Sequence, residues 1–192
     1  MLTRGNHKLP RTIGIFNLPH RVTCPGATEE CKTYCYARKA EVQYKQVIPY
    51  RYRNLELSKQ KDFVERMCEE ISHTRTMTAV RIHESGDFYN QAYVDKWAKI
   101  AKTFPHIQFT FYTKSFHLFD FSELRRLKNV TAFASVDPTT PTERLAYTKG
   151  WKKATVIENT HAPKGFFMCT GDCHMCSHCY KHETTSVAFK KH

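Results

Sequence analysis

The segment Thr78–Tyr89, with the sequence TAVRIHESGDFY, joins a short apolar run to a polar loop. Residues 78–82 are rich in β-branched side chains and predict a buried strand. Residues 83–89 then bring His, Glu, Ser and Asp side chains together in a loop. Because ligands in parallel α/β folds bind at the carboxyl ends of the strands, this succession predicts a strand that ends at a functional site.

Runs of the same kind recur along the chain, and helical patterns lie between them. Further strands are expected at 12–17, 107–112, 130–136 and 154–157, with 187–189 as a candidate last strand. Helices are expected where an apolar face follows a capping residue, namely after Asp62 with Glu65, after Asn90, after Ser122, and after Thr140 with Pro141 as far as Gly150. This alternation predicts parallel strands joined by right-handed crossovers.

The expected fold class is α/β, in the form of a partial, open β/α barrel of five to six parallel strands. A closed eight-stranded barrel needs about 250 residues, which is more than this chain has, and a doubly wound sheet is the structural alternative. We expect a single domain over 1–192, with the partial barrel at 12–160 and a cysteine-rich metal-binding segment at 165–182. Cys68 lies on the apolar face of the helix expected after Asp62 and is interpreted as a core residue.

Composition and charge restrict the classes of partner and location. The 192 residues include 30 Lys plus Arg against 18 Asp plus Glu, a formal net charge of +12, which predicts an anionic partner with nucleic acid as the first candidate. No run approaches the roughly 18 apolar residues of a membrane span, and the first residues carry no apolar signal region. We therefore expect a cytoplasmic protein without a membrane partner. The oligomeric state is not predicted.

One stretch combines positive charge with aromatic rings. The run 51–53, Arg-Tyr-Arg, is flanked by Tyr44, Lys45 and Tyr50. Such a stretch can hold phosphates and stack on bases of a single strand. The alternative is a solvated helix face whose long side chains cover apolar surface.

Seven of the eight cysteines fall into two groups. The members are Cys24, Cys31 and Cys35 near one end, and Cys169, Cys173, Cys176 and Cys179 near the other. In a chain with no expected secretion signal, clustered cysteines predict metal ligands rather than disulfides. We therefore expect a metal site at each group.

The two groups predict different kinds of site. The C-terminal spacing C-x3-C-x2-C-x2-C is typical of ferredoxin-like iron–sulfur clusters, with zinc as the alternative metal and His174 and His178 as additional zinc ligands. The N-terminal group has three cysteines, which on a four-iron cluster leave one iron open. An open coordination position is typical of reactive metal centres. His20, or a cysteine of the C-terminal group, is the alternative fourth ligand.

Polar side chains follow several of the expected strands. They are Glu84, Ser85, Gly86 and Asp87 after the second strand, Lys114 and Ser115 after the third, and Ser135 and Asp137 at the end of the fourth. Because parallel strands end at the same edge of a sheet, we expect these residues to gather beside the N-terminal cysteines. Ordinary turn and capping chemistry is the alternative for each of them.

Three cysteines after the first strand, the last preceded by Tyr34, resemble the cluster loop of radical SAM enzymes. The resemblance implies a 4Fe-4S cluster on these cysteines, S-adenosylmethionine at the open iron and a partial (β/α)6 barrel. It also implies that 84–87 receive the amino group of the methionine and that Ser135 and Asp137 lie at the ribose. The spacing here is C-x6-C-x3-C, whereas that superfamily uses C-x3-C-x2-C.

A second resemblance covers nearly the whole chain. The motifs are CPGA at 24–27, CYA at 35–37, RIHESGDFY at 81–89 and YTKS at 112–115, together with the C-terminal cysteine group. This combination resembles a family of phage gene products. The resemblance implies a phage or prophage origin, and hence the cytoplasm of the host as the location.

Two hypotheses of function follow. The first is an iron–sulfur protein of the radical SAM type, an enzyme with an open-iron cluster, a second metal site on the four C-terminal cysteines, and Lys114 and Ser115 lining the rest of the pocket. Its substrate is not predicted. The alternative is a non-catalytic iron–sulfur or zinc protein that binds nucleic acid or a host protein. Its clusters would then be structural or redox-sensing, and a host reductant is a further expected partner of either form.

Overall fold

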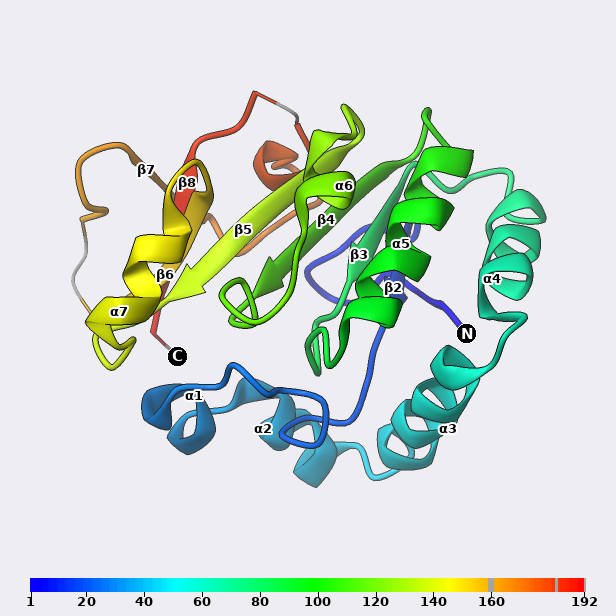
Figure 1. Cartoon of the computed structure of the whole chain (residues 1–192), viewed down its shortest axis with the longest axis horizontal. Coiled ribbons are helices and arrows are strands. Elements are labelled where there is room, and N and C mark those ends of the chain that lie inside the picture. The colour runs from blue at the N-terminus through cyan, green and yellow to red at the C-terminus, as the bar shows by residue number, and fades with distance from the viewer. Residues whose placement is uncertain (159–160, 182, 192) are drawn as a thin grey trace.

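The computed structural model describes residues 1–158, 161–181 and 183–191. Within them, one eight-stranded sheet has the order β1-β2-β3-β4-β5-β6-β8-β7 (Figure 1). The strands are β1 (Thr3–Arg4), β2 (Ile13–Phe16), β3 (Ala79–Ile82), β4 (Gln108–Thr113), β5 (Val130–Val136), β6 (Lys152–Ile157), β7 (Phe166–Met168) and β8 (Ser186–Lys190). β1 is antiparallel to β2, and the other neighbours are parallel. The expected α/β fold with an open, mostly parallel sheet is confirmed.

Helices occupy the connections between the strands. They are α1 (Glu29–Thr33), α2 (Tyr36–Gln43), α3 (Val47–Lys59), α4 (Phe63–Ser72), α5 (Gln91–Thr103), α6 (Ser122–Arg126) and α7 (Thr142–Leu145), with short 3-10 turns η1 (Ala146–Thr148) and η2 (His178–Tyr180). From β2 to β6 the strand order follows the chain without reversal. A doubly wound sheet requires such a reversal, so this part of the sheet is not doubly wound.

The sequential order places the crossover helices on one face of the sheet. Right-handed crossovers that always advance in the same direction put their helices on the same side, and α4, α5 and α6 pack there (Figure 1). Phe16 of β2, Phe63 of α4 and Trp97 of α5 are fully buried in this layer. The Phe16 ring lies edge-on to the other two, with centroid distances of 5.6 Å to Phe63 and 5.5 Å to Trp97. These contacts form the main core.

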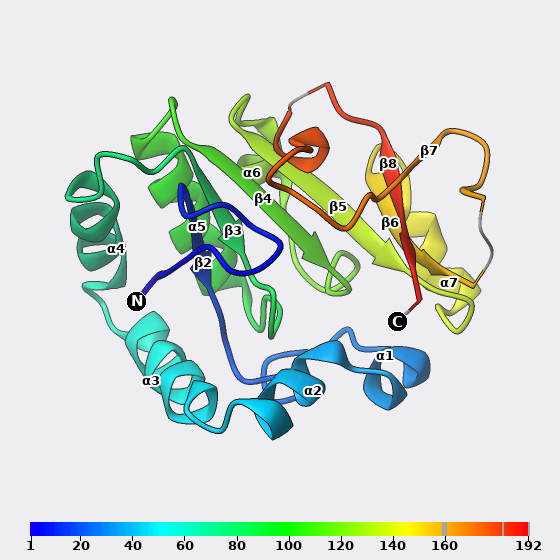
Figure 2. The same cartoon turned by 180° about the vertical axis from the view of Figure 1, so that it is seen from behind.

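The opposite face of the sheet is covered by the two ends of the chain. Figure 2 shows β7 beside β8 and the segment after β7 crossing in front of β5 and β4. Thr110 Oγ1 of β4 donates to the Cys179 carbonyl at 2.8 Å, and Cys173 N donates to the Lys8 carbonyl at 2.9 Å. We call this side the inner face. The C-terminal cysteine group therefore lies across the inner face, while the helices lie on the other.

The predicted strands are confirmed to within about two residues at their ends, and the sheet extends past residue 160 through β8 and β7. The Asn90 cap is also confirmed, because its Oδ1 accepts from Tyr93 N at 2.8 Å. Cys68 is half-buried against the main core, as expected. The sequence did not predict β1, β7 or the helices α1 and α2, and it indicated α3 only through the helix face suggested around 51–53.

The predicted chemistry of three other helix starts is wrong. Asp62 precedes α4 but its carboxylate accepts from Arg66 Nε at 2.7 Å, in an ion pair one turn along the helix. Thr140 Oγ1 accepts from Asp137 N at 2.9 Å, so it closes a turn rather than capping α7. Ser122 is the first residue of α6, not its cap. For Asp62 and Thr140, a nearby donor takes the side-chain oxygen that the helix would have used, whereas Ser122 N donates to Asp120 Oδ1 at 2.8 Å.

Among residues 1–158, 161–181 and 183–191, no helix has the length and apolar character needed to cross a membrane.

A buried histidine at the end of β3 predicts a pH effect on stability. His83 has a positive φ of 68°, is 3% exposed, and its Nε2 lies 2.9 Å from the Tyr93 hydroxyl. Burial, with a smaller effect of Arg81, lowers its pKa from 6.5 to about 3. A depressed histidine pKa contributes stability above the unfolded value, and the contribution is lost as the pH falls. We expect about 1.4 kcal/mol less stability for each pH unit below 6.5.

The measurement is the free energy of unfolding in denaturant at pH 7 and pH 5.5. The comparison is His83→Asn, since asparagine tolerates a positive φ and does not titrate. The wild type should lose more stability than the variant on acidification. An equal loss in both proteins would show that His83 is not held neutral.

Candidate functional site

The loop between β2 and α1 carries Cys24 and is packed tightly against the ends of β3 and β4. A Cβ on Gly26 would lie 2.2 Å from the Lys114 carbonyl oxygen. Gly86 has a φ of +84°, and a Cβ there would lie 2.6 Å from Thr23 Oγ1. Only glycine fits either position, because the neighbouring atoms leave no space and L-residues avoid that φ. The cysteine loop is therefore held directly on the carboxyl ends of the strands.

Asp87 joins the loops that follow β3 and β4. Its carboxylate is 5% exposed and accepts from Phe88 N (2.7 Å), Thr113 Oγ1 (2.7 Å), Lys114 N (2.8 Å) and Ser115 Oγ (3.2 Å). Burial raises the pKa of Asp87 to about 6, against the lowering effect of these hydrogen bonds. Both oxygens are used within the protein, so Asp87 and Ser115 shape the site rather than reach into it.

A second network joins the cysteine loop to β4 and β5. Lys114 Nζ forms an ion pair with Asp137 and lies 3.4 Å from the Ser135 carbonyl. Asp137 also accepts from Thr28 Oγ1 at 2.5 Å, and Thr28 caps α1 by accepting from Cys31 N at 3.3 Å. Burial would raise the pKa of Asp137, but the hydrogen bonds from Lys114 and Thr28 outweigh it and hold the pKa below its usual value. The anionic Asp137 thus positions the helix that carries Cys31.

The three N-terminal thiols are free and half-buried. Burial raises the pKa of Cys24, and the charges of Asp87, Cys31 and Cys35 raise it further. Burial also raises the pKa of Cys31, while Lys114 lowers it. The thiols of Cys24 and Cys31 are therefore neutral unless a cation displaces their protons, as metal coordination does.

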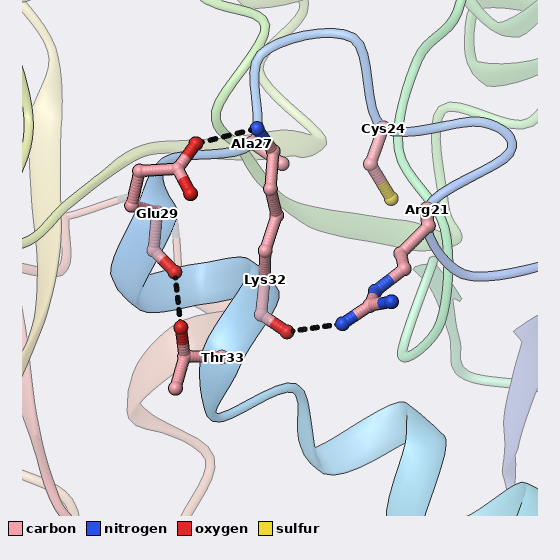
Figure 3. Close-up of a pocket in the computed structure, with 6 residues that line it drawn as sticks. All are labelled: Arg21, Cys24, Ala27, Glu29, Lys32 and Thr33. Atoms are coloured by element: carbon pink, nitrogen blue, oxygen red, sulfur yellow. Dashed lines mark hydrogen bonds and ion pairs between the residues drawn. The ribbon is translucent and has the colours of Figure 1, made fainter.

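An open pocket lies beside Cys24. It has a volume of about 400 Å³, within the size range of small-molecule sites, and its lining includes Arg21, Cys24, Glu29 and Lys32. Figure 3 shows the side chains of Cys24 and Arg21 on the same side of this pocket. Arg21 Nη2 donates to the Lys32 carbonyl at 2.8 Å, and Lys32 Nζ pairs with Glu29 at 2.7 Å. These contacts leave an open space with cationic side chains next to the first cysteine.

The four C-terminal thiols form a second neighbourhood on the inner face. Burial raises the pKa of Cys173 to about 11, and Cys169, Cys179 and Cys176 add to the shift while Arg81 opposes it. Gly171 N lies 3.4 Å from Cys169 Sγ, in the arrangement of an amide that donates to sulfur. The strongest sulfur neighbours of each cysteine group are members of the same group.

Single-ion metal sites were considered for the whole described chain. Within residues 1–158, 161–181 and 183–191, no three His, Cys, Asp or Glu side chains converge closely enough to hold one metal ion. A single zinc ion lies about 2.3 Å from each thiolate, whereas a multi-iron cluster binds its cysteines at separate irons. Binding of a cluster at either group stays a prediction.

The histidines suggested as additional ligands have other partners. His20 Nδ1 lies 2.9 Å from Glu41 Oε1. The ring of His178 stacks on Phe167 at a centroid distance of 3.9 Å, and His174 N donates to Asp172 Oδ1 at 2.8 Å. The His20 and His178 rings are thus already in contact with neighbours.

The segment 84–87 is held by its own backbone and side-chain contacts. Asn17 Oδ1 accepts from Glu84 N at 2.8 Å and from Ser85 N at 2.9 Å, and Ser85 Oγ donates to the Leu18 carbonyl at 2.8 Å. Glu84 Oε1 accepts from Asn6 Nδ2 at 2.9 Å. The Ser85 side chain is therefore used to hold the turn, which was the alternative role considered for it from the sequence. Asn17 was missed, although it ends the first predicted strand.

The expected site residues come together only in part. The three N-terminal cysteines lie with Asp87, Lys114 and Asp137 at the carboxyl edge, and Gly26, Ser135 and Thr28 line one small recess there. Thr28 was missed by sequence reasoning, since its role depends on reaching Asp137, which is 109 residues away in the chain. The four C-terminal cysteines lie on the inner face instead.

The basic aromatic run is divided by the structure. Arg51 is 5% exposed, and its Nη1 donates to Glu41 Oε1 at 2.7 Å and to the Ala37 carbonyl at 3.1 Å. Tyr50 donates its hydroxyl to the Met1 carbonyl at 2.6 Å. The interpretation of Arg51 as a phosphate contact is wrong, because its charge is paired inside the protein. Tyr52 and Arg53 are exposed.

Comparison with known proteins identifies the family. The family described as "Gene product 88" matches residues 1–189. The "Gene 88 protein" of Mycobacterium phage D29 and that of Mycobacterium phage L5 are each 30% identical over 152 residues, and each match covers 71% of this chain and 62% of the relative. The chain thus spans less than two thirds of these relatives, and no solved structure matches it significantly. The chain belongs to the Gene product 88 family of phage proteins.

Proposed function

We propose that this protein is an iron–sulfur protein of the radical SAM type. Cys24, Cys31 and Cys35 would hold a 4Fe-4S cluster with one open iron, and the C-terminal cysteines would hold a second metal site. The observation that supports the proposal is that the loop carrying Cys24, with its free thiol, is packed directly on the carboxyl ends of a parallel sheet. That edge is where parallel α/β enzymes bind their ligands.

The strand order supports the same proposal. Six parallel strands follow in the order β2-β3-β4-β5-β6-β8, with the crossover helices of the main core on one face. An open sheet wound in one direction is the architecture of a partial β/α barrel. The inner face would then correspond to the barrel interior, and the C-terminal cysteine segment would fill it.

The donor set fits an iron–sulfur cluster. The cysteines are free and half-buried, and the raised pKa of Cys24 and Cys31 keeps these thiols protonated until a cation displaces the protons. A bound cluster of this type supplies the electron for reductive cleavage of S-adenosylmethionine, and an external reductant must provide that electron. The host cytoplasm, which keeps thiols reduced, is the location we propose.

The chain's own residues would bind and position the cofactor. Arg21 and Lys32 beside the open pocket would attract an anionic group such as the carboxylate of S-adenosylmethionine. Glu84 would receive the amino group, because its carboxylate is less committed than those of Asp87 and Asp137. Asp87 and Asp137 would act as positioning residues that hold the cysteine loop on the strand ends.

A second candidate function is contact with nucleic acid, without catalysis. Tyr44 and Tyr52 are each 48% exposed, and Lys45 and Arg53 beside them are exposed as well. Exposed rings between cations suit stacking on bases and contact with phosphates. In this second candidate function, the clusters would be structural or redox-sensing groups, and zinc is the alternative metal at the C-terminal group.

The deciding experiment is metal and sulfide analysis of protein purified without oxygen. We expect brown protein that contains both iron and acid-labile sulfide, and release of 5′-deoxyadenosine after addition of S-adenosylmethionine and dithionite. Zinc without sulfide would reject the iron–sulfur assignment. A cluster whose EPR spectrum does not respond to S-adenosylmethionine would instead favour the non-catalytic candidate.

A further inference from the structure

Arg81 places a cation on the inner face of the sheet. In β3 the side chains alternate, so that Val80 and Ile82 join the main core on the helix side while Ala79 and Arg81 face the other way. The Arg81 guanidinium lies over the Tyr112 ring, 3.9 Å from its centroid. Arg81 Nε donates to the His83 carbonyl at 3.0 Å. The guanidinium is thus fixed in place at the centre of the inner face.

The charge of Arg81 has no anionic partner in the part of the chain that the structure describes. No ion pair involves Arg81 there, and no terminal guanidinium nitrogen of it donates a hydrogen bond to a described residue. The carboxylate that contributes to the raised pKa of Arg81 is that of Glu84, which accepts from Asn6 Nδ2 at 2.9 Å. An arginine presents paired N–H groups that match carboxylate and phosphate oxygens, and here those groups are unused.

A second unsatisfied group lies beside it. The Tyr180 hydroxyl is buried and has no hydrogen-bond partner among the described residues, and Arg81 is its strongest charged neighbour. A buried hydroxyl without a partner costs about 1–3 kcal/mol. A ligand that accepts a hydrogen bond from Tyr180 would remove this cost. The orphaned hydroxyl therefore indicates an acceptor at the same position as the unpaired cation.

Arg81 is close to the C-terminal cysteine group. It is the register partner of Thr110 in β4, whose Oγ1 donates to the Cys179 carbonyl at 2.8 Å. The Tyr112 ring under the guanidinium packs in the same cluster as Cys169 and Cys179. A molecule held at Arg81 would therefore lie beside the metal site predicted for the C-terminal cysteines.

We propose that Arg81, with the hydroxyl of Tyr180, binds an oxyanion of the substrate, either a carboxylate or a phosphate group, on the inner face beside the C-terminal cysteine group. That this anion belongs to a substrate rests on the proposed function, whereas the binding of the anion at Arg81 does not. The competing role for Arg81 is a fixed counter-charge to metal-bound thiolates at Cys173 and Cys179. In that role it would bind no added anion.

The test is calorimetric titration of anaerobically purified, full-length protein with inorganic phosphate and, separately, with acetate in a chloride buffer. We expect saturable binding of at least one of the two anions, and the anion that binds more tightly identifies the chemical class.

Arg81→Gln should weaken binding by about tenfold or more, because a charge-assisted pair of hydrogen bonds is lost. Arg81→Lys should weaken anion binding less, because the positive charge stays and only the paired N–H donors of the guanidinium are lost. Tyr180→Phe should weaken it about threefold to tenfold at unchanged iron content.

The matched control is Arg125→Gln. Arg125 also stacks on a ring, with 4.2 Å to the Trp151 centroid, but lies outside the inner face. Its substitution should leave anion binding unchanged. The proposal is overturned if neither anion binds saturably, or if Arg81→Gln lowers iron content and leaves anion binding intact. Protein without iron that still binds the anion through Arg81 would reject the proposed function and keep this inference.

Discussion

Gly26→Ala is expected to destabilise the protein by about 3 kcal/mol, at the upper end of the usual cost of overpacking. The added Cβ would lie 2.2 Å from the Lys114 carbonyl oxygen and 2.8 Å from Ser115 N. Both are backbone atoms at the end of β4, which cannot move as a flexible side chain can. The cysteine loop must therefore detach from the strand ends, and we expect iron at the N-terminal group to fall with stability. Denaturant unfolding and iron analysis measure the two effects.

The matched control is Gly14→Ala in β2. Its Cβ would also be crowded, but by the Met77 side chain at 3.0 Å and the Leu2 side chain at 3.1 Å, which can rotate away. We expect a clearly smaller loss of stability and no loss of iron. If Gly26→Ala loses no more stability and no more iron than Gly14→Ala, close packing on β4 does not hold the cysteine loop in place.

Cys35→Ala and Cys176→Ala are each expected to remove about half of the bound iron. The thiols of each group have their strongest sulfur neighbours within that group, and the groups lie at different places on the sheet. Each substitution should therefore empty one site and spare the other. Iron and sulfide counting on anaerobically purified variants measures this.

The two cysteine variants should also differ in stability. The C-terminal segment covers the inner face through the bond from Thr110 to Cys179 and through Cys173 N, so emptying that site should lower the unfolding temperature more than emptying the other. Cys68→Ala serves as the control, because Cys68 packs against the core. Loss of all iron in either single variant would show one shared site. Loss of iron in Cys68→Ala would contradict its role as a core residue.

The strands of the sheet are predictable because their signal is local. A strand such as 130–136 is written in consecutive β-branched and aromatic residues, and β5 occupies the same seven positions. The helices before α4 carry no such signal. The buried side of α3 consists of Arg51, Asn54, Leu55 and Ser58, so its inward face is mostly polar and the hydrophobic period is absent. Arg51 and the amide nitrogen of Asn54 donate to partners outside α3, namely the Glu41 carboxylate and the Asn17 carbonyl, which no local pattern shows.

The candidate site was also predictable from the sequence only in part. Its residue types, the position of the polar residues after the strands and the grouping of the cysteines follow from the sequence, since chain order and parallel strands suffice to place them at one edge. Which of them face a ligand does not follow. Asp87 and Ser85 are adjacent to Gly86 in a motif that looks functional, yet both bond to neighbouring loops.

The sequence by itself determined the α/β class, the parallel strands and the two cysteine groups, because each depends on residues close together in the chain. Tertiary structure decided which charged side chains are paired within the described chain. Asp137 is committed to Thr28, 109 residues away, whereas Arg81 is left without an anionic partner in the described chain. Pairing of a charge depends on which segments meet in space. The two cysteine groups are therefore recognised from the sequence, whereas only the tertiary structure shows that Arg81 lies on the inner face beside the C-terminal group.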